Sequence, residues 1–466
     1  MNKLKHKAFW IFTGDIVGRG FAFFTSLYLA NTLGKEYYGL ITVAISILGY
    51  ATWFSDLGLI NMGTRETAKP PEKRLFRITE IFRTRLFLGI IVLVFASGAV
   101  YLIELEDLQK QVVLSYLFSI IPYVLLLDWF YAGKQEFGKI ALSKILNGAA
   151  YFSLVIIFIQ TAEDITLVPY LYTIGIATAS LILAGFAFSS KPFALPTRGI
   201  HIYQDLIKSS SLLGTGRFFG QMIQLLPPLA IGAILSLNAA GEYGVAFKIV
   251  IIAMLIDRVF VNILLPNLST LWSVDKTTAV LRIDTVYRLV AAGGAFIAMI
   301  IAICANHIIE LLFNPEYVQS IILLQVLSVL IAVTFINSLF SFGLIATNKD
   351  HDYFTAMVSG GTIAGFIILV MTYFGNVISA ALSVSIAEIV ITVFTYWKFK
   401  QAIQINFIRP LLLCYPAAFL LFLGSLYMPG PQIVSAVIAA PVFLLLIFKF
   451  NLLEESQIRW IKSKLW

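Results

Sequence analysis

Charged residues and cysteines are scarce in this chain of 466 residues. Asp, Glu, Lys and Arg together make up 12% of it, whereas hydrophobic residues make up 59%. This balance excludes a soluble protein with a large core and indicates an integral membrane protein. The two cysteines, Cys304 and Cys414, both lie inside apolar runs, so we expect them to be small core residues.

The residue patterns of catalysis and nucleotide binding are also lacking. The chain has four histidines, which lie in the terminus, in loops or at the ends of apolar runs without the spacing of metal ligands. There is no phosphate-binding glycine-rich loop and no soluble nucleotide-binding domain. We therefore expect no enzyme, no metal site and no cofactor, and we expect any transport to draw on a H⁺ or Na⁺ gradient or on downstream consumption. The net charge of +8 does not indicate a nucleic-acid partner, because the basic residues are scattered through short loops.

Long apolar runs fill most of the chain. A helix of about 20 apolar residues crosses the ~30 Å hydrocarbon layer of a membrane. We therefore expect an all-α polytopic membrane protein with about fourteen transmembrane helices. The expected spans are residues 8–33, 40–63, 82–103, 112–132, 140–160, 167–188, 209–235, 242–265, 285–310, 320–347, 353–374, 379–400, 410–428 and 433–450.

The basic residues predict the orientation of these spans. Of the 33 Lys and Arg, only Lys35 and Lys110 fall in loops on one side, and Arg19, Arg217 and Lys248 fall within spans. All others lie in connections or span ends on the side of the N-terminus. Because cytoplasmic loops are enriched in Lys and Arg, both termini are predicted to be cytoplasmic.

The connections on the outer side are all short, which leaves no room there for a catalytic domain. The longest inner connection, residues 189–208, has apolar residues on one helical face and is expected to be an interfacial helix. It separates six spans from the next six. We expect residues 1–208 to form an N-terminal six-helix bundle that includes this linking helix. Residues 209–400 are expected to form a second six-helix bundle, and residues 401–466 an extra helix pair with an amphipathic cytoplasmic tail.

Asp15 and Arg19 lie one helical turn apart in the first span, beside Gly14, Gly18 and Gly20. Charges at this depth are costly, so they must face protein or a watery cavity. The glycines leave room for a neighbouring helix or a ligand. We interpret the pair as part of a substrate cavity, and the alternative is a structural ion pair that fixes helix contacts. Asp56, near the inner end of the second span, is expected to cap a helix or to pair with an arginine such as Arg65.

A second group of polar residues lies in spans 7 and 8. Arg217, Gln221 and Gln224 share one helical face, and Lys248 lies in the next span. Basic groups within membrane spans suit an anionic head group, since the planar guanidinium of Arg can bind phosphate through two hydrogen bonds. We expect these four residues to bind substrate. For Gln221 and Gln224 alone, the alternative is hydrogen bonding between helices.

Glu388 lies near the middle of the twelfth span, with Ser385 and Thr392 on roughly the same face. A carboxylate among hydroxyl groups inside a membrane can hold a proton or a hard cation such as Na⁺. We therefore assign Glu388, Ser385 and Thr392 to ion coupling. The alternative is permanent pairing of Glu388 with Lys248 or Arg217.

Four stretches carry a resemblance to the polysaccharide-exporter flippases, which transport O-antigen and other oligosaccharide repeat units. That family belongs to the multidrug/oligosaccharidyl-lipid/polysaccharide exporter superfamily. The stretches are Phe54-Ser-Asp-Leu-Gly-Leu-Ile-Asn-Met-Gly-Thr-Arg-Glu-Thr-Ala-Lys69, Asp128-Trp-Phe-Tyr-Ala-Gly-Lys-Gln-Glu-Phe-Gly-Lys139, Ala240-Gly-Glu-Tyr-Gly-Val-Ala-Phe-Lys248 continuing to Leu265-Pro-Asn-Leu268, and Leu312-Phe-Asn-Pro-Glu-Tyr317 followed by Leu324-Gln-Val-Leu327. Together they are spread over most of the first twelve spans.

This resemblance implies two six-helix bundles around a central cavity that opens alternately inward and outward. It also implies a polyprenyl-linked oligosaccharide as cargo, membrane lipids as surroundings, and a glycan polymerase and glycosyltransferases as partners. Two rival interpretations share some features. A multidrug exporter of the same fold is expected to have an acidic cavity, and a membrane-bound glycan polymerase or ligase is expected to need a large outer loop.

Overall fold

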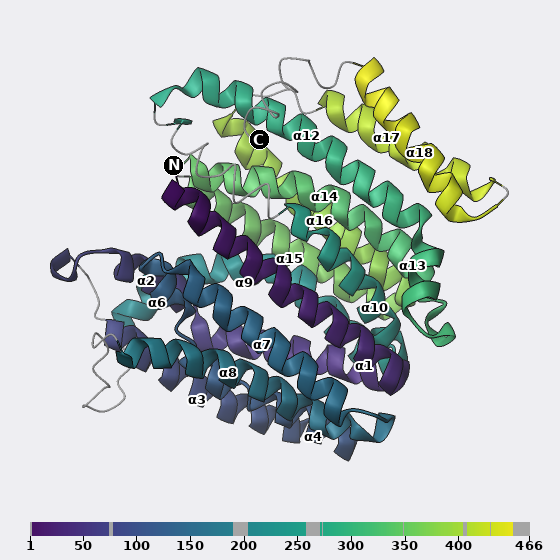
Figure 1. Cartoon of the computed structure of the whole chain (residues 1–466). Helices are drawn as coiled ribbons and strands as arrows, with labels where there is room; N and C mark the ends of the chain where they lie inside the picture. Colours follow the sequence, from purple (N-terminus) through teal and green to yellow (C-terminus); the bar gives the residue numbers. More distant parts are fainter. Residues whose placement is uncertain are drawn as a thin grey trace. The chain divides into compact units, whose positions relative to one another are not determined.

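The structure is a computed structural model that describes residues 2–73, 78–189, 204–257, 271–272, 274–347, 349–403, 408–428 and 430–450. All regular elements in these ranges are helices (Figure 1). The α-helices of the first half are α1 (Asn2–Asp56), α2 (Leu59–Ala68), α3 (Ile78–Leu102), α4 (Asp107–Leu117), α5 (Ile120–Leu125), α6 (Asp128–Gly133), α7 (Phe137–Phe158), α8 (Val168–Ser189), α9 (Gln204–Ile234) and α10 (Leu237–Ala253). Those of the second half are α12 (Lys276–Ile303), α13 (Ala305–Leu312), α14 (Ser320–Ala346), α15 (Asp350–Phe374), α16 (Val377–Ala402), α17 (Ile408–Leu426) and α18 (Gln432–Lys449). Most of the expected linking helix and the whole tail after residue 450 lie outside the described residues.

Each of the expected spans overlaps one or more described helices. Among the described residues, 12 helices are long and apolar enough to cross a membrane. One of them, Phe12–Asp56, has 45 residues and is long enough for two crossings. The 31-residue helix α9, which contains Pro227 and Pro228, is a further candidate. The prediction of an all-α polytopic fold is therefore confirmed.

Helix α1 contains the turn between the first two expected spans. Gly34 has a left-handed φ of 78° and a non-helical ψ of 169°. The hydroxyl groups of Ser26 and Tyr38 are 2.5 Å apart across this position. A straight helix would separate these residues by about 18 Å along its axis, so the chain folds back at Gly34.

The helices form two compact units, Met1–Gly241 and Glu242–Trp466. Helix α9 packs against α1 and α2 and so belongs to the first unit. The expected boundary at residues 208 and 209 lies within the first two turns of this helix, whereas the compact units divide after it. The arrangement as two six-helix bundles and an extra pair stays a prediction.

The fourth expected span is interrupted twice, as α4, α5 and α6. The first interruption, at Phe118 and Ser119, lies one turn before Pro122. Proline has no N–H to donate to the carbonyl group four residues earlier, so the helix is weakened there. At the second interruption, Nη1 of Arg85 donates to the carbonyl oxygen of Leu126 at 3.1 Å. The guanidinium of α3 therefore satisfies a backbone group that the interrupted helix leaves free.

Asp56 ends α1 and caps the helix that follows it. Its Oδ1 accepts the N–H of Ile60 at 3.0 Å, and its Oδ2 accepts the N–H of Gly58 at 3.3 Å. Its ion-pair partner is Arg85, whose Nε lies 3.5 Å from Oδ1 and whose side chain is 0% exposed. The expected cap is thus confirmed, but the arginine that Asp56 pairs with is Arg85 and not Arg65. Arg85 can reach Asp56 because α3 packs against both α1 and α2.

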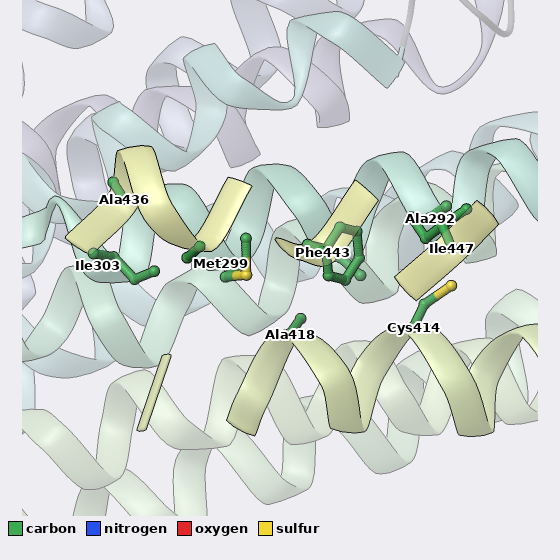
Figure 2. Close-up of a cluster of buried hydrophobic side chains, with 10 residues drawn as sticks. Ala292, Met299, Ile303, Cys414, Ala418, Ala436, Phe443 and Ile447 are labelled. Carbon is green, nitrogen blue, oxygen red and sulfur yellow. The ribbon is translucent and has the colours of Figure 1, made fainter. Parts of the chain in front are cut away.

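In the second unit, α14 packs against α12, α15 and α16 and is buried along most of its length. The last two helices, α17 and α18, pack against α12 through an apolar cluster (Figure 2). In this cluster Phe443 of α18 is fully buried, with Ala292 of α12 and Cys414 of α17 around it. Cys414 is a buried free thiol, as expected from its apolar run.

Candidate functional site

The second crossing of α1 and helix α9 approach each other closely within the first unit. A Cβ atom built on Gly214 of α9 would lie 2.7 Å from the carbonyl carbon of Leu57 and 3.0 Å from the nitrogen of Gly58. Gly58 itself has a left-handed φ of 86° and faces the carbonyl oxygen of Ser210. This backbone contact fixes the register of α9 against the end of α1, and so it decides which residues of α9 stay uncovered.

The uncovered face of α9 carries the polar residues that the sequence indicated. Gln224 is exposed and Gln221 is half-buried. Gly220, on the same face, has no atom within 4 Å of the place where a Cβ would be. Arg217 is on this helix one turn earlier, and its side chain lies outside the described part of the structure. Polar side chains avoid lipid, so this face borders protein or a watery space.

An aromatic cluster lies beside this polar face, and the sequence reasoning did not identify it. The ring of Phe218 on α9 lies 4.4 Å from the ring of Trp53 and 5.9 Å from that of Tyr50, measured between centroids. Nε1 of Trp53 donates to the carbonyl oxygen of Gly214 at 3.1 Å, which fixes the indole against α9. Phe54, the next residue, is 49% exposed. The spacing of Tyr50, Trp53 and Phe54 by three to four residues was the available signal.

Asp15 binds a lysine of another helix. Its Oδ1 lies 2.7 Å from Nζ of Lys144 on α7, and both side chains are partly exposed. The two helices approach closely here, because a Cβ on Gly14 would lie 2.6 Å from Cα of Ala141. The glycine therefore makes room for a neighbouring helix, one of the two expected uses. Arg19 is half-buried on the same helix.

Lys248 lies on α10 among buried apolar residues and is itself half-buried. Neither an ion pair nor a hydrogen bond joins it to another described residue. An ammonium group without a partner at membrane depth is costly and is typical of a functional site.

Glu388 of α16 is 5% exposed and is held by neutral donors of α14. Nδ2 of Asn337 donates to its Oε1 at 2.9 Å, and Oγ1 of Thr334 donates to the same oxygen at 3.2 Å. Within the described residues Glu388 has no ion pair, and so none with Lys248. Permanent pairing of Glu388 with Lys248, which was the alternative, is therefore not among the described contacts.

Hydroxyl groups extend this contact on both helices. Oδ1 of Asn337 accepts hydrogen bonds from Thr395 at 2.9 Å and from Ser341 at 3.1 Å. Ser385 and Thr392 do not reach the carboxylate. Their hydroxyl groups donate to the backbone oxygens of Val326 and Glu388, respectively.

A second buried carboxylate binds the same face of α14. Oγ of Ser338 donates to Oδ2 of Asp257, which is 5% exposed. Thr334, Asn337, Ser338 and Ser341 follow the helical spacing i, i+3, i+4 and i+7, so they form one polar stripe in the second half of a mostly apolar helix. The sequence reasoning missed this stripe, although its spacing was visible. Within the described residues, no group of three or more His, Cys, Asp or Glu side chains is arranged to hold a metal ion.

Comparison with known proteins agrees with the sequence resemblance. An Escherichia coli (strain K12) protein named for O-antigen transport is 20% identical over 84% of this chain and 96% of its own length. The lipopolysaccharide biosynthesis protein WzxC of the same organism is 23% identical over 77% of this chain and 74% of its own length. The fold is similar to that of the lipid II flippase MurJ in its inward closed conformation, with a TM-score of 0.75 and 11% identity over 94% of this chain and 98% of that one.

The family assignment rests on a match across more than half of the chain. Residues 4–272 match the family described as polysaccharide biosynthesis protein. The matched region includes the close α1–α9 contact, the polar face of α9 and Lys248. The chain therefore belongs to the polysaccharide biosynthesis protein family of multi-span membrane proteins.

Proposed function

We propose that this protein is a flippase that moves polyprenyl-(pyro)phosphate-linked oligosaccharide from the cytoplasmic to the outer leaflet by alternating access, for surface polysaccharide assembly. The observation that carries this proposal is the uncovered polar face of α9 in a chain that belongs to a polysaccharide biosynthesis family. The names of the two bacterial relatives, one for O-antigen transport and one for lipopolysaccharide biosynthesis, support a glycan cargo. The first of these names also favours transport over catalysis.

The charged end of the cargo is assigned to basic side chains. In this proposal Arg217 binds the lipid-linked phosphate through two hydrogen bonds, while Arg19 and Lys248 add positive charge. Lys248 suits this role because it has no partner among the described residues. Asp15 positions the first crossing of α1 through its ion pair with Lys144.

The sugar part of the cargo is assigned to the amides and the aromatic cluster. Gln221 and Gln224 supply donors and acceptors for hydroxyl groups. Trp53 and Phe54 supply flat apolar surfaces of the kind that, combined with a few polar groups, line small-molecule sites. These groups share one side of the α1–α9 pair, since Phe218 of α9 contacts the aromatic residues of α1.

Ion coupling is assigned to Glu388. We propose that it takes up a proton or Na⁺ while Asn337 and Thr334 hold its carboxylate in place. Ser385 and Thr392 support α16 through their backbone hydrogen bonds and do not bind the ion directly. The neutral surroundings suit a group that changes its charge during a cycle, because no cation among the described residues forms an ion pair with the carboxylate.

The proposed setting is the bacterial inner membrane, with both termini in the cytoplasm. Glycosyltransferases would supply the lipid-linked cargo on the cytoplasmic side, and a glycan polymerase would consume it on the other. The proposal includes the expected division into bundles of residues 1–208 and 209–400 with the extra helix pair in 401–466.

A flipping assay in proteoliposomes tests the proposal. The cargo is a polyprenyl-pyrophosphate-linked oligosaccharide with a fluorescent label on the sugar, and dithionite destroys the label in the exposed leaflet. The wild-type protein should make nearly all of the label accessible, whereas protein-free vesicles should protect about half of it. Arg217→Ala should lose the activity, and Arg217→Lys should restore only part of it because the two-bond geometry is lost.

Two controls sharpen this assay. Lys276→Ala removes a basic residue at the start of α12 and should flip like the wild type. Export of a cationic dye from the same vesicles tests the rival multidrug function. Dye transport without flipping of the labelled lipid would overturn the proposal, as would full flipping by Arg217→Ala.

A further inference from the structure

A cavity of about 220 Å³ lies within the first unit and is separate from the polar face of α9. It is lined by residues of α1, α2, α6 and α7. Its volume is below the ~300 Å³ at which pockets for drug-sized ligands begin, so it suits a chemical group smaller than such a ligand. Two of the four stretches that resemble the exporter family line it, through Ile60 and Thr64 of one and Asp128, Trp129 and Phe137 of the other.

The cavity holds a carboxylate with a free oxygen. Oδ1 of Asp128 accepts the backbone N–H of Trp129 at 2.8 Å, and Oδ2 has no partner among the described residues. The lysines of the same stretch are engaged elsewhere. Lys139 binds Glu136 at 2.6 Å, and Lys134 lies 4.4 Å from the ring centroid of Phe130. Asp128 therefore attracts a cation that the described part of the chain does not supply.

The same cavity holds a donor that can bind an acceptor. Trp129 is 1% exposed and contributes its ring to the wall. Lys144 also lines the cavity, and its side chain is 47% exposed. Its ammonium group binds Asp15 and has two further N–H groups. An occupant thus needs a hydrogen-bond acceptor that lies close to the ammonium group of Lys144.

The remaining walls are aromatic or apolar. Trp10 lies against Gly138 of α7, and Phe137 and Ile140 follow on the same helix. Aromatic faces near a carboxylate favour an ammonium group through cation–π attraction. Tryptophans at the ends of membrane helices are typical of the level of lipid head groups.

We propose that this cavity binds the phosphoethanolamine head group of a membrane lipid. The primary amine donates to Oδ2 of Asp128, and the phosphate accepts from Nζ of Lys144. A primary amine is preferred to a quaternary one, because only the former has N–H groups for the carboxylate. With the predicted orientation, the lipid belongs to the cytoplasmic leaflet. This proposal does not depend on the proposed cargo.

Native mass spectrometry of the purified full-length protein tests this proposal. The protein is incubated with equal amounts of phosphatidylethanolamine, phosphatidylcholine and phosphatidylglycerol, and the retained lipids are counted. Phosphatidylethanolamine should be retained in excess. Asp128→Asn should reduce its retention about tenfold, as expected for the loss of one charge-assisted hydrogen bond. The asparagine oxygen still accepts the N–H of Trp129, so the fold at α6 is preserved.

Two further variants separate binding from folding. Asp107→Asn changes an exposed carboxylate at the first residue of α4 outside the cavity, and should leave retention unchanged. Ala132→Phe places a ring in the cavity and should prevent retention without a change of charge. Equal retention of the three lipids by the wild type, or unchanged phosphatidylethanolamine retention in both Asp128→Asn and Ala132→Phe, would overturn the proposal.

Thermal unfolding identifies the source of the head group. Protection by phosphatidylethanolamine vesicles alone supports a membrane lipid as the occupant. Equal protection by soluble glycerophosphoethanolamine supports the same site with a soluble source. Protection by a neutral monosaccharide and not by phosphatidylethanolamine would assign the cavity to sugar and overturn the proposal.

Discussion

The side-chain amide of Asn337 on α14 donates a 2.9 Å hydrogen bond to Oε1 of Glu388 on α16. The same amide accepts hydrogen bonds from Thr395 and Ser341 through its oxygen. Asn337 therefore connects the one carboxylate of α16 to the hydroxyl groups around it. Because both groups are buried, the strength of this contact determines how readily Glu388 can change its charge.

Asn337→Ala should destabilise the protein by about 1–3 kcal/mol, because it leaves a buried acceptor with only Thr334 as donor. The free energy of unfolding in mixed micelles measures this change. A double-mutant cycle with Glu388→Gln gives the coupling energy of the pair, which should be at least about 0.5 kcal/mol. Strict additivity of the two changes would contradict the contact.

Glu388→Gln should still bind cargo but should cycle poorly, because glutamine imitates the protonated acid and cannot release the proton. Cargo flipping by the wild type should respond to an imposed H⁺ or Na⁺ gradient across the vesicle. This response should disappear in the variant. A variant that flips and responds like the wild type would assign Glu388 to a structural role only.

Arg85→Met should destabilise the first unit by about 3–5 kcal/mol, because the buried ion pair of Arg85 with Asp56 would be lost. Arg65→Met is the matched control. Arg65 is exposed on α2 and should have little effect on the free energy of unfolding. Adding Asp56→Asn to Arg85→Met should recover part of the loss, since the buried carboxylate charge is then removed. Equal effects of the two arginine variants would contradict the assigned ion pair.

Two glycines of α9 should respond in opposite directions to the same change. Gly214→Ala should lower the yield of folded protein, because its Cβ would lie 2.7 Å from the backbone of Leu57. Gly220→Ala meets no neighbour and should stabilise the helix by up to ~1 kcal/mol through the higher helix propensity of alanine. Fluorescence-detected size exclusion and thermal unfolding measure both effects. Similar losses in the two variants would indicate that the α1–α9 contact is not the cause.

Reporter fusions test the predicted orientation. Fusions at Gln109 and Ser236 should report the outer side, and fusions at Lys73 and Lys276 the cytoplasm, because the basic residues are concentrated in the latter connections. A fusion after Trp466 should be cytoplasmic if the number of crossings is even. An external signal there would contradict the expected fourteen spans.

The sequence was sufficient for the spans, because the cost of exposing backbone and polar side chains to lipid is a local property of each segment. Every expected span overlaps one or more described helices, including the two crossings within α1. The sequence also indicated that Asp15, Glu388 and the polar face of α9 are unusual within membrane spans. Interruptions within a span were less predictable. Pro122 gave a local signal for one break, whereas the break at Leu126 depends on a hydrogen bond from Arg85 on another helix.

Only the tertiary structure decided which groups meet. Asp15 binds Lys144, 129 residues later, and Glu388 binds Asn337, 51 residues earlier. Spacing and charge in the sequence indicated other partners: Arg19, one helical turn away, for Asp15, and the cationic Lys248 for Glu388. Which side chains come within hydrogen-bond distance depends on how helices cross, and close contacts such as that of Gly14 with Ala141 fix those crossings. The aromatic cluster around Phe218 and the cavity beside Asp128 exist for the same reason: each joins helices that are distant in the chain and adjacent only after packing.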